Sequence, residues 1–273
     1  MIKALFFDLD GTLLNSEKKI PRSAREALRA CRQKGIRVFL ASARSPRLSE
    51  TLGWTAEEFS LFDGGIYSNG GYVEAAGKKE YAFIDAGTVK KCVEAVCGYP
   101  NVHLSLHTPG HGYAFNFPFN EELKAGWGIT EENLRPLNDD TMEQTAKMLV
   151  FWGNLVGERA LMPEALCRKM EEICRERARL YITDQGAAMQ LTSLQAGKKT
   201  AVDYVREQLF LKADEIIFFG DDLNDLEVIR AYPVTVAMGN GAEEVKQAAK
   251  YVTAANDEDG IAQAIRMLGL IEN

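Results

Sequence analysis

Long apolar runs are missing from this sequence, since no stretch reaches the roughly 18 consecutive apolar residues that a membrane-spanning helix needs. No block rich in lysine and arginine occurs, and the formal net charge is −7. These two features argue against a membrane or a nucleic acid as a partner. The first residues lead into an apolar segment without the pattern of a signal peptide, so we expect a cytoplasmic protein.

Cysteine and histidine are also scarce. The five cysteines are odd in number and scattered without CxxC spacing, which indicates neither a disulfide framework nor a zinc site. His103, His107 and His111 are spaced four apart, as ligands on a helix would be. Pro109 and Gly110 break any helix there, so this spacing does not predict a metal site.

What remains is the composition of an ordinary globular protein. Apolar residues make up 46% of the sequence and charged residues 26%. The length of 273 residues is enough for one large domain or two smaller ones. We expect a monomer or a weak homodimer.

Segments typical of strands and helices alternate at both ends of the sequence. Apolar strands are expected at 2–7, 36–42 and 65–69, and again at 215–220, 234–240 and 251–253, with helical spacing between them. This alternation predicts an α/β fold with a doubly wound, parallel-sheet (Rossmann-like) core.

The middle of the sequence has a different pattern. The segments "VHLSLHT" and "YAFNF" flank a Pro-Gly turn, which favours antiparallel strands. We therefore expect residues 83–186 to form an inserted α+β cap domain, and residues 1–82 and 187–273 to form the core.

Polar side chains follow the expected core strands at the point where each strand ends. Ligands of open parallel sheets bind beyond the carboxyl ends of the strands. These polar side chains should therefore lie together at one edge of the sheet. "AGKKTAV" adds Lys198 at an expected helix start. The residues after the strands are Asp8, Asp10, Ser42, Arg44, Asn69, Gly70, Asp221, Asn224 and Asp225.

Such a cluster of carboxylates predicts a bound cation. Neighbouring carboxylates raise one another's pKa unless a cation compensates, and oxygen ligands with a substrate phosphate suit Mg²⁺. Asp8 and Asp10 would share this metal and a phosphate. One carboxylate can attack phosphorus to give an aspartyl-phosphate, and the other can protonate the leaving oxygen and later activate water.

Four segments together resemble a known family. "DLDGTLL" at 8–14, "ASAR" at 41–44, "AGKKTAV" at 196–202 and "GDDLND" at 220–225 are similar, in order and spacing, to the four motifs of the haloacid dehalogenase superfamily. "SNGGYVE" and the C-terminal "AMGNGAEEVKQAAKYVTAANDEDGIAQAI" resemble its Cof-type, sugar-phosphatase-like branch. The resemblance spans essentially the whole core.

The resemblance implies a role for each matching residue. Asp8 would be the nucleophile and Asp10 the acid and base, with the Asp10 backbone carbonyl also on the metal. Ser42 and Lys198 would hold phosphate oxygens. Asp221 would bind Mg²⁺ directly, while Asn224 and Asp225 would act through water or orient the site. The residues implied to lie at the substrate are Gly11, Arg44, Asn69, Gly70 and Asn224.

This chain departs from the family pattern at three positions. Ser42-Ala43 stands where Thr-Gly is commoner, and serine keeps the hydroxyl. Lys199 stands where glycine usually follows the motif lysine, so Lys198 or Lys199 could contact phosphate, and the spacing to "AV" at 201–202 favours Lys198. Gln190 replaces a usual glutamate, for which we have no physical account.

Within the insertion, one strand offers a polar face. His103, Ser105 and His107 alternate with apolar residues, so their side chains share one side of the strand, either simply solvated or in contact with substrate. Together these features predict a Mg²⁺-dependent phosphatase acting on a small phosphorylated metabolite. A phosphomutase with the same intermediate and a non-catalytic sensor of a phosphorylated ligand are the alternatives.

Overall fold

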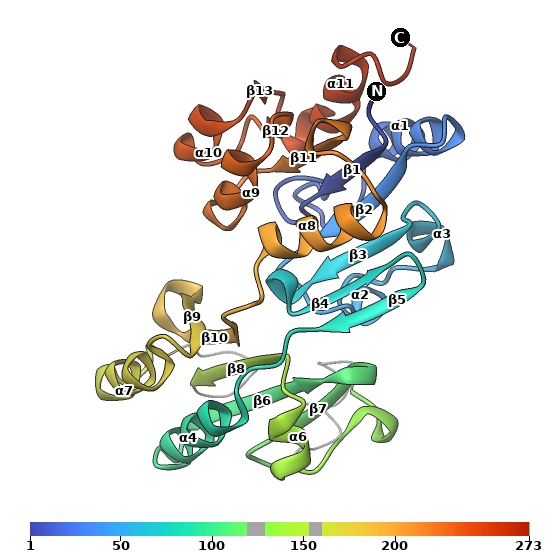
Figure 1. Ribbon diagram of the computed structural model, residues 1–273. Coiled ribbons are helices and arrows are strands. Elements are labelled where there is room, and N and C mark those ends of the chain that lie inside the picture. Colours follow the sequence, from blue (N-terminus) through green and yellow to red (C-terminus); the bar gives the residue numbers. More distant parts are fainter. Residues whose placement is uncertain (119–128, 153–159, 273) are drawn as a thin grey trace. The chain divides into compact units, whose positions relative to one another are not determined.

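The computed structural model describes residues 1–118, 129–152 and 160–272 (Figure 1). They divide into two compact units. We call Met1–Glu80 with Gly197–Asn273 the core unit, and Tyr81–Ala196 the cap unit. Across the described ranges, every helix is too short or too polar to cross a membrane.

The core unit is built on a mixed sheet. Its eight described strands lie in the order β13-β12-β11-β1-β2-β3-β4-β5, and the six from β13 to β3 run parallel. The parallel strands are β1 (Ala4–Phe7), β2 (Arg37–Ala41), β3 (Gly64–Tyr67), β11 (Ile216–Gly220), β12 (Thr235–Ala237) and β13 (Tyr251–Val252).

Helices cover both faces of this sheet, as predicted. Phe6 and the apolar faces of α8, α9 and α10 share one cluster. Phe7 points to the opposite face because strand side chains alternate, and it stacks on Phe219. On that side α1 packs on β2 and on α11. These helices are α1 (Arg22–Gln33), α8 (Lys198–Gln208), α9 (Leu226–Ala231), α10 (Glu243–Ala248) and α11 (Gly260–Met267).

The first helix follows its sequence pattern closely. Ala24, Ala27, Leu28 and Cys31 are its buried residues, and they recur at the spacing of one helical face. Gly35 follows the helix with φ +80°, a left-handed conformation that glycine adopts without strain.

The second helical segment does not begin directly after β2. Its first helix, α2, spans Leu48–Leu52 and is followed by α3 (Ala56–Phe59). Pro46 accounts for the delay, because the residue before a proline is disfavoured in helical conformation. Arg44 therefore lies in the loop after β2.

A hairpin completes the core sheet. β4 (Tyr72–Ala75) pairs antiparallel with β3, and β5 (Lys78–Tyr81) lies beside β4. Ala76 and Gly77 connect them with φ +53° and +74°, as in the tight turns that suit hairpins.

The cap unit contains a five-stranded antiparallel sheet among its described residues, in the order β7-β6-β8-β10-β9. Its strands are β6 (Val102–Thr108), β7 (Gly112–Phe115), β8 (Lys147–Trp152), β9 (Ala178–Thr183) and β10 (Ala188–Ser193). α4 (Ala86–Cys97) and α7 (Glu164–Cys174) pack on the face that carries Leu104, Val150 and Met189, and α6 (Asp139–Glu143) packs beside α4.

The predicted second boundary of the insertion needs correction. It was expected between residues 186 and 187, but the cap unit extends to Ala196 and begins at Tyr81 rather than at 83. The reason is β10, which pairs with β8 on one side and β9 on the other. These hydrogen bonds assign residues 188–193 to the cap sheet.

Candidate active site

The predicted nucleophile lies where β1 ends. Asp8 follows the strand directly and is buried, and its backbone N–H donates to the Phe219 carbonyl of β11. The loop then turns back, since the amides of Leu13 and Leu14 donate to the carbonyls of Asp8 and Leu9. The central position of β1 thus fixes the Asp8 carboxyl at the carboxyl edge of the sheet.

Lys198 connects two of the predicted carboxylates. It is the first residue of α8, and its Nζ lies 2.5 Å from Asp8 Oδ1 and 2.6 Å from Asp225 Oδ1. All three side chains are buried. Lys199 instead pairs with Asp203 at the surface of α8. The structure therefore places Lys198, and not Lys199, in the carboxylate cluster.

The Asp225 side chain holds the loop after β11 through hydrogen bonds to its backbone. Its Oδ2 accepts the backbone N–H groups of Asp221 and Asp222 at 3.0 and 3.3 Å, so both of its oxygens are occupied. Asp222 caps the short helix η6 (Leu223–Asp225) by accepting the Leu223 N–H, as expected for an acid at a helix start.

Asp221 lies between this loop and the one after β1. Its Oδ1 accepts the hydroxyl of Thr12 at 2.6 Å. Burial raises the pKa of Asp221 to about 6, although the Thr12 hydrogen bond opposes the rise. Thr12 was not among the predicted site residues, although its position in "DLDGT" was an available signal.

Burial also dominates the electrostatics of Asp8. Desolvation raises the pKa of its carboxyl to about 8, against the attraction of Lys198, and the nearby Asp225 adds to the rise. The pKa of Lys198 is raised as well, because Asp225 and Asp8 together outweigh the effect of burial. The ammonium therefore stays charged.

Asp10 has a different environment. Its carboxylate accepts two hydrogen bonds from the Arg44 guanidinium, at 2.5 and 2.7 Å, and a third from Lys18 at 2.7 Å. Burial alone would raise the pKa of Asp10, but these hydrogen bonds bring it below the ordinary value. Lys18 is a contact that the sequence pattern did not reveal.

The remaining predicted phosphate and substrate residues of the core lie in neighbouring loops. Ser42 is buried, and its Oγ accepts the Arg44 N–H at 3.1 Å. Asn69 has φ +53°, donates its backbone N–H to the Ser42 carbonyl, and accepts a long hydrogen bond of 3.4 Å from Asn224. Gly70 follows at φ +92°, where a Cβ would lie 2.5 Å from the Gly197 carbonyl oxygen.

The C-terminal motif supports the loop that follows Asp8. The Asn240 amide donates to the Gly11 carbonyl at 2.8 Å, and its Oδ1 accepts the Asn256 N–H. The Asn256 amide in turn donates to the Leu14 carbonyl at 2.7 Å. Sequence reasoning noted "AMGNG" as a branch-specific stretch without finding this positioning role.

Gly11→Ala tests how closely the two loops must approach. Gly11 has φ +82°, and a Cβ there would lie 2.2 Å from Asp221 Oδ2. We expect the usual strain of a left-handed residue, roughly 1–2 kcal/mol, plus displacement of Asp221 and loss of most activity. Steady-state kinetics and thermal unfolding would measure the two effects.

Gly35→Ala is the matched control for this prediction. It has nearly the same φ, +80°, but no atom within 4 Å of the added Cβ. It should lose comparable stability and keep full activity. Equal activity in the two variants would contradict the assignment of Asp221 to the active site.

The donor set fits a divalent cation. Carboxylate oxygens of Asp8, Asp221 and Asp225 lie within 4.8 Å of one another, and the Lys198 ammonium pairs with two of these acids, Asp8 and Asp225. Among the described residues, the second oxygens of Asp8 and Asp221 accept no hydrogen bond, so they are available as hard ligands.

The metal contacts of two further residues, Asp10 and Asn224, stay predictions. The Asp10 carboxylate is held by Arg44 and Lys18, which leaves only its backbone carbonyl for the expected contact. Asn224 turns its amide to Asn69.

The two predicted cap residues, His103 and His107, belong to the other unit. Their side chains share one face of β6, because Val102, Leu104 and Leu106 occupy the opposite face, which belongs to the apolar cluster of the cap unit. The centroid of the His103 ring lies 4.4 Å from that of Phe117. The Ser105 hydroxyl and His107 Nε2 share a hydrogen bond of 3.1 Å. Their contact with a substrate stays a prediction.

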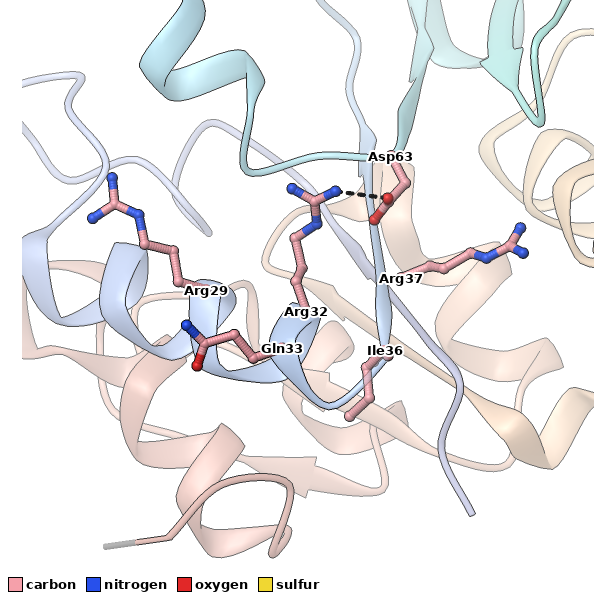
Figure 2. A pocket seen from close by; sticks show the side chains of 7 residues that line it. Arg29, Arg32, Gln33, Ile36, Arg37 and Asp63 are labelled. Carbon is pink, nitrogen blue, oxygen red and sulfur yellow. Dashed lines mark hydrogen bonds and ion pairs between the residues drawn. The ribbon is translucent and has the colours of Figure 1, made fainter.

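A cavity of about 450 Å³ lies at the other end of the core strands from the carboxylate cluster. It is bounded by the end of α1, the start of β2 and Asp63, which precedes β3 (Figure 2). Figure 2 shows Arg32 paired with Asp63, while Arg29 and Arg37 point away in different directions. These guanidinium groups do not converge, so the carboxylate cluster is the better candidate for catalysis.

Comparison with known proteins shows the family of this chain. The family model for haloacid dehalogenase-like hydrolases matches residues 5–265. The 5-amino-6-(5-phospho-D-ribitylamino)uracil phosphatase YcsE of Bacillus subtilis is 27% identical over 97% of this chain and 95% of its own length.

Solved structures give the same picture. The subclass IIB sugar phosphatase BT4131 is 28% identical, with a TM-score of 0.72 over 98% of this chain and 100% of the other. A haloacid dehalogenase-like hydrolase from Bacteroides thetaiotaomicron is 25% identical, with a TM-score of 0.78 over the same shares. With the family model covering nearly the whole sequence, this chain is a phosphoric monoester hydrolase and belongs to the haloacid dehalogenase-like hydrolases.

Proposed function

We propose that this enzyme is a Mg²⁺-dependent phosphatase that hydrolyses small phosphorylated metabolites, such as sugar phosphates, through an aspartyl-phosphate on Asp8. The observation that carries this proposal is the environment of Asp8. Lys198 holds one of its oxygens at 2.5 Å, and the second oxygen accepts no hydrogen bond from the described residues. A fixed Asp8 side chain with one available oxygen suits attack on phosphorus once the carboxyl is ionised, which a bound cation would favour against the effect of burial.

The reaction would proceed in two steps. In the first, an Asp8 oxygen forms a bond to phosphorus while the bond from phosphorus to the leaving oxygen breaks, and Asp10 gives that oxygen a proton. In the second, water attacks phosphorus, Asp10 takes its proton, and the bond to Asp8 breaks to release phosphate. Asp8, Asp221 and Asp225 would hold or orient Mg²⁺, which supplies charge compensation when bound.

The contacts of Asp10 set a condition on this cycle. Bound by Arg44 and Lys18, its carboxylate is ionised, which suits the base of the second step. To act as the acid in the first step, Asp10 must take up a proton, and its hydrogen bonds with Arg44 must open. An anionic substrate offers Arg44 an alternative partner.

Activity is expected to require Mg²⁺, and Ca²⁺ should support it poorly. Calcium accepts more oxygen ligands at longer distances, so it can engage both oxygens of Asp8 and leave none to attack. Release of phosphate from an aryl phosphate would be measured after chelation and after adding back each metal. Unchanged activity after chelation, or equal activity with calcium, would refute this dependence. Asp221→Ala should shift the Mg²⁺ requirement to higher concentrations.

The polar face of β6 is proposed to help select the substrate. His107→Ala is expected to raise KM for a good sugar phosphate and to leave hydrolysis of a small aryl phosphate nearly unchanged, because the aryl group offers no hydroxyl to bind. His103→Ala should have the smaller effect, since its ring packs against Phe117 and Phe151. Kinetics of both variants on both substrates would test this, and equal small effects would count against it.

A further inference from the structure

A row of polar side chains crosses the cap sheet from edge to edge. His107 of β6 pairs with Tyr113 of β7 on one side and with Lys147 of β8 on the other. Lys147 pairs in turn with Thr192 of β10, and Thr192 pairs with Arg179 of β9. Directly opposed residues of antiparallel strands have their side chains on the same face. We call these five residues the polar row.

The polar row lies on the face of the sheet opposite the one on which α4 and α7 pack. Leu106, Met148 and Leu191 each adjoin a row residue in the sequence, and all three belong to the apolar cluster under those helices. Since side chains alternate along a strand, the row residues point to the opposite side.

The chemistry of the row is that of hydrogen-bond donors. Lys147 and Arg179 can only donate, Thr192 and Tyr113 carry hydroxyls, and no member is acidic. Lys147 is only 7% exposed and Thr192 only 2%. An ammonium attracts an oxyanion more strongly at such a buried position than in water, because the local dielectric constant is lower.

Thr192 provides a separate indication of a ligand. Its Oγ1 is buried and has no hydrogen-bond partner among the described residues. Buried polar groups are normally paired, so an unpaired hydroxyl next to Lys147 is accounted for by a group that binds there. At the end of the row, the Arg179 Nε donates to the Leu194 carbonyl at 3.2 Å.

We propose that the polar row binds an oxyanion, a phosphate or carboxylate group, which is either a free anion or a second acidic group on the substrate. Lys147 and Thr192 form its centre. The second source rests on the proposed function and narrows its substrate class to phosphomonoesters with two anionic groups. The first source does not depend on that function.

Binding can be measured without turnover. In the full chain with labelled threonine methyl groups, Thr192→Val assigns the Thr192 signal by its disappearance. Titration with sodium sulfate, against sodium chloride at equal ionic strength, should shift this signal saturably in the wild type. Lys147→Met should abolish the shift. Lys90→Met, at an exposed position of α4, is the matched control and should retain it.

Two results would overturn the proposal: no saturable shift in the wild type, or the same shift in Lys147→Met. The second result would mean that the Thr192 signal reports sulfate bound elsewhere in the protein. Thr192→Val should fold as stably as the wild type or more so, because it removes an unpaired buried hydroxyl.

Kinetics would then distinguish the two sources. If the anion is part of the substrate, Lys147→Met should raise KM about tenfold or more for a hexose bisphosphate and leave KM for the matching monophosphate unchanged. Unchanged KM for both, with the sulfate shift lost, would identify a free anion. A wild-type protein that hydrolyses neither compound would contradict the proposed function, while the sulfate titration would still decide the proposal for the row.

Discussion

Asp8→Asn is expected to abolish turnover while the protein remains folded. The amide keeps the shape of the carboxylate but cannot form a bond to phosphorus, so kcat should fall by at least about 10⁴-fold. Stability should change little, since Lys198 keeps Asp225 as its partner and the substitution removes a carboxylate whose pKa burial raises to about 8.

Phosphate release from an aryl phosphate, with circular dichroism and thermal unfolding of the same sample, would measure both expectations. Asp203→Asn serves as the control, because it removes an acid that pairs with Lys199 at the surface of α8. Appreciable hydrolysis by folded, uncontaminated Asp8→Asn protein would exclude Asp8 as the nucleophile.

Lys198→Ala should have the second largest effect, on both activity and stability. It leaves the buried carboxylates of Asp8 and Asp225 without their shared ammonium. Removing one partner of a buried ion pair typically costs about 3–5 kcal/mol of folding free energy. Loss of a charge that compensates the transition state should lower kcat by at least about 10²-fold, measured well below the melting temperature.

Lys199→Ala is the matched control at the next position. Its ion pair with Asp203 is partly exposed, and such pairs contribute about 0–1 kcal/mol. Chemical denaturation and steady-state kinetics of the two variants would show the contrast. If Lys199→Ala were the more damaging, the placement of Lys198 beside the nucleophile would be wrong.

The sequence was sufficient to predict which residues gather at the candidate active site of the core. Asp8, Ser42, Asn69 and Asp221 each follow a buried parallel strand, and the carboxyl ends of such strands share one edge. The spacing of buried residues in α1 is likewise a local property that the sequence displays directly.

Contacts between distant loops could not be predicted in this way. Thr12 and Asp221 are 209 residues apart, and no local pattern pairs a threonine hydroxyl with a particular carboxylate. The contact of Asn240 with the Gly11 carbonyl depends equally on how two loops meet.

Strand register was the other property that local pattern did not supply. Lys147 begins an apolar strand, and only its pairing with His107 and Thr192 places it in a polar row. The boundary of the cap unit was missed for a similar reason. Residues 188–193 alternate like many strands, and it is their pairing with β8 and β9 that assigns them to the cap sheet.

The position of β1 in the centre of the core sheet has a consequence for synthesis on the ribosome. One of its two neighbours, β11, is encoded after the entire cap unit, and Lys198 lies 190 residues beyond Asp8. At about 5–20 residues per second, one hydrogen-bonding edge of the apolar strand β1 stays unpaired with β11 for roughly 10–40 s. Unpaired edges of apolar strands promote aggregation, so the nascent chain passes through a vulnerable period in which Asp8 has been synthesised but Lys198 and Asp225 have not.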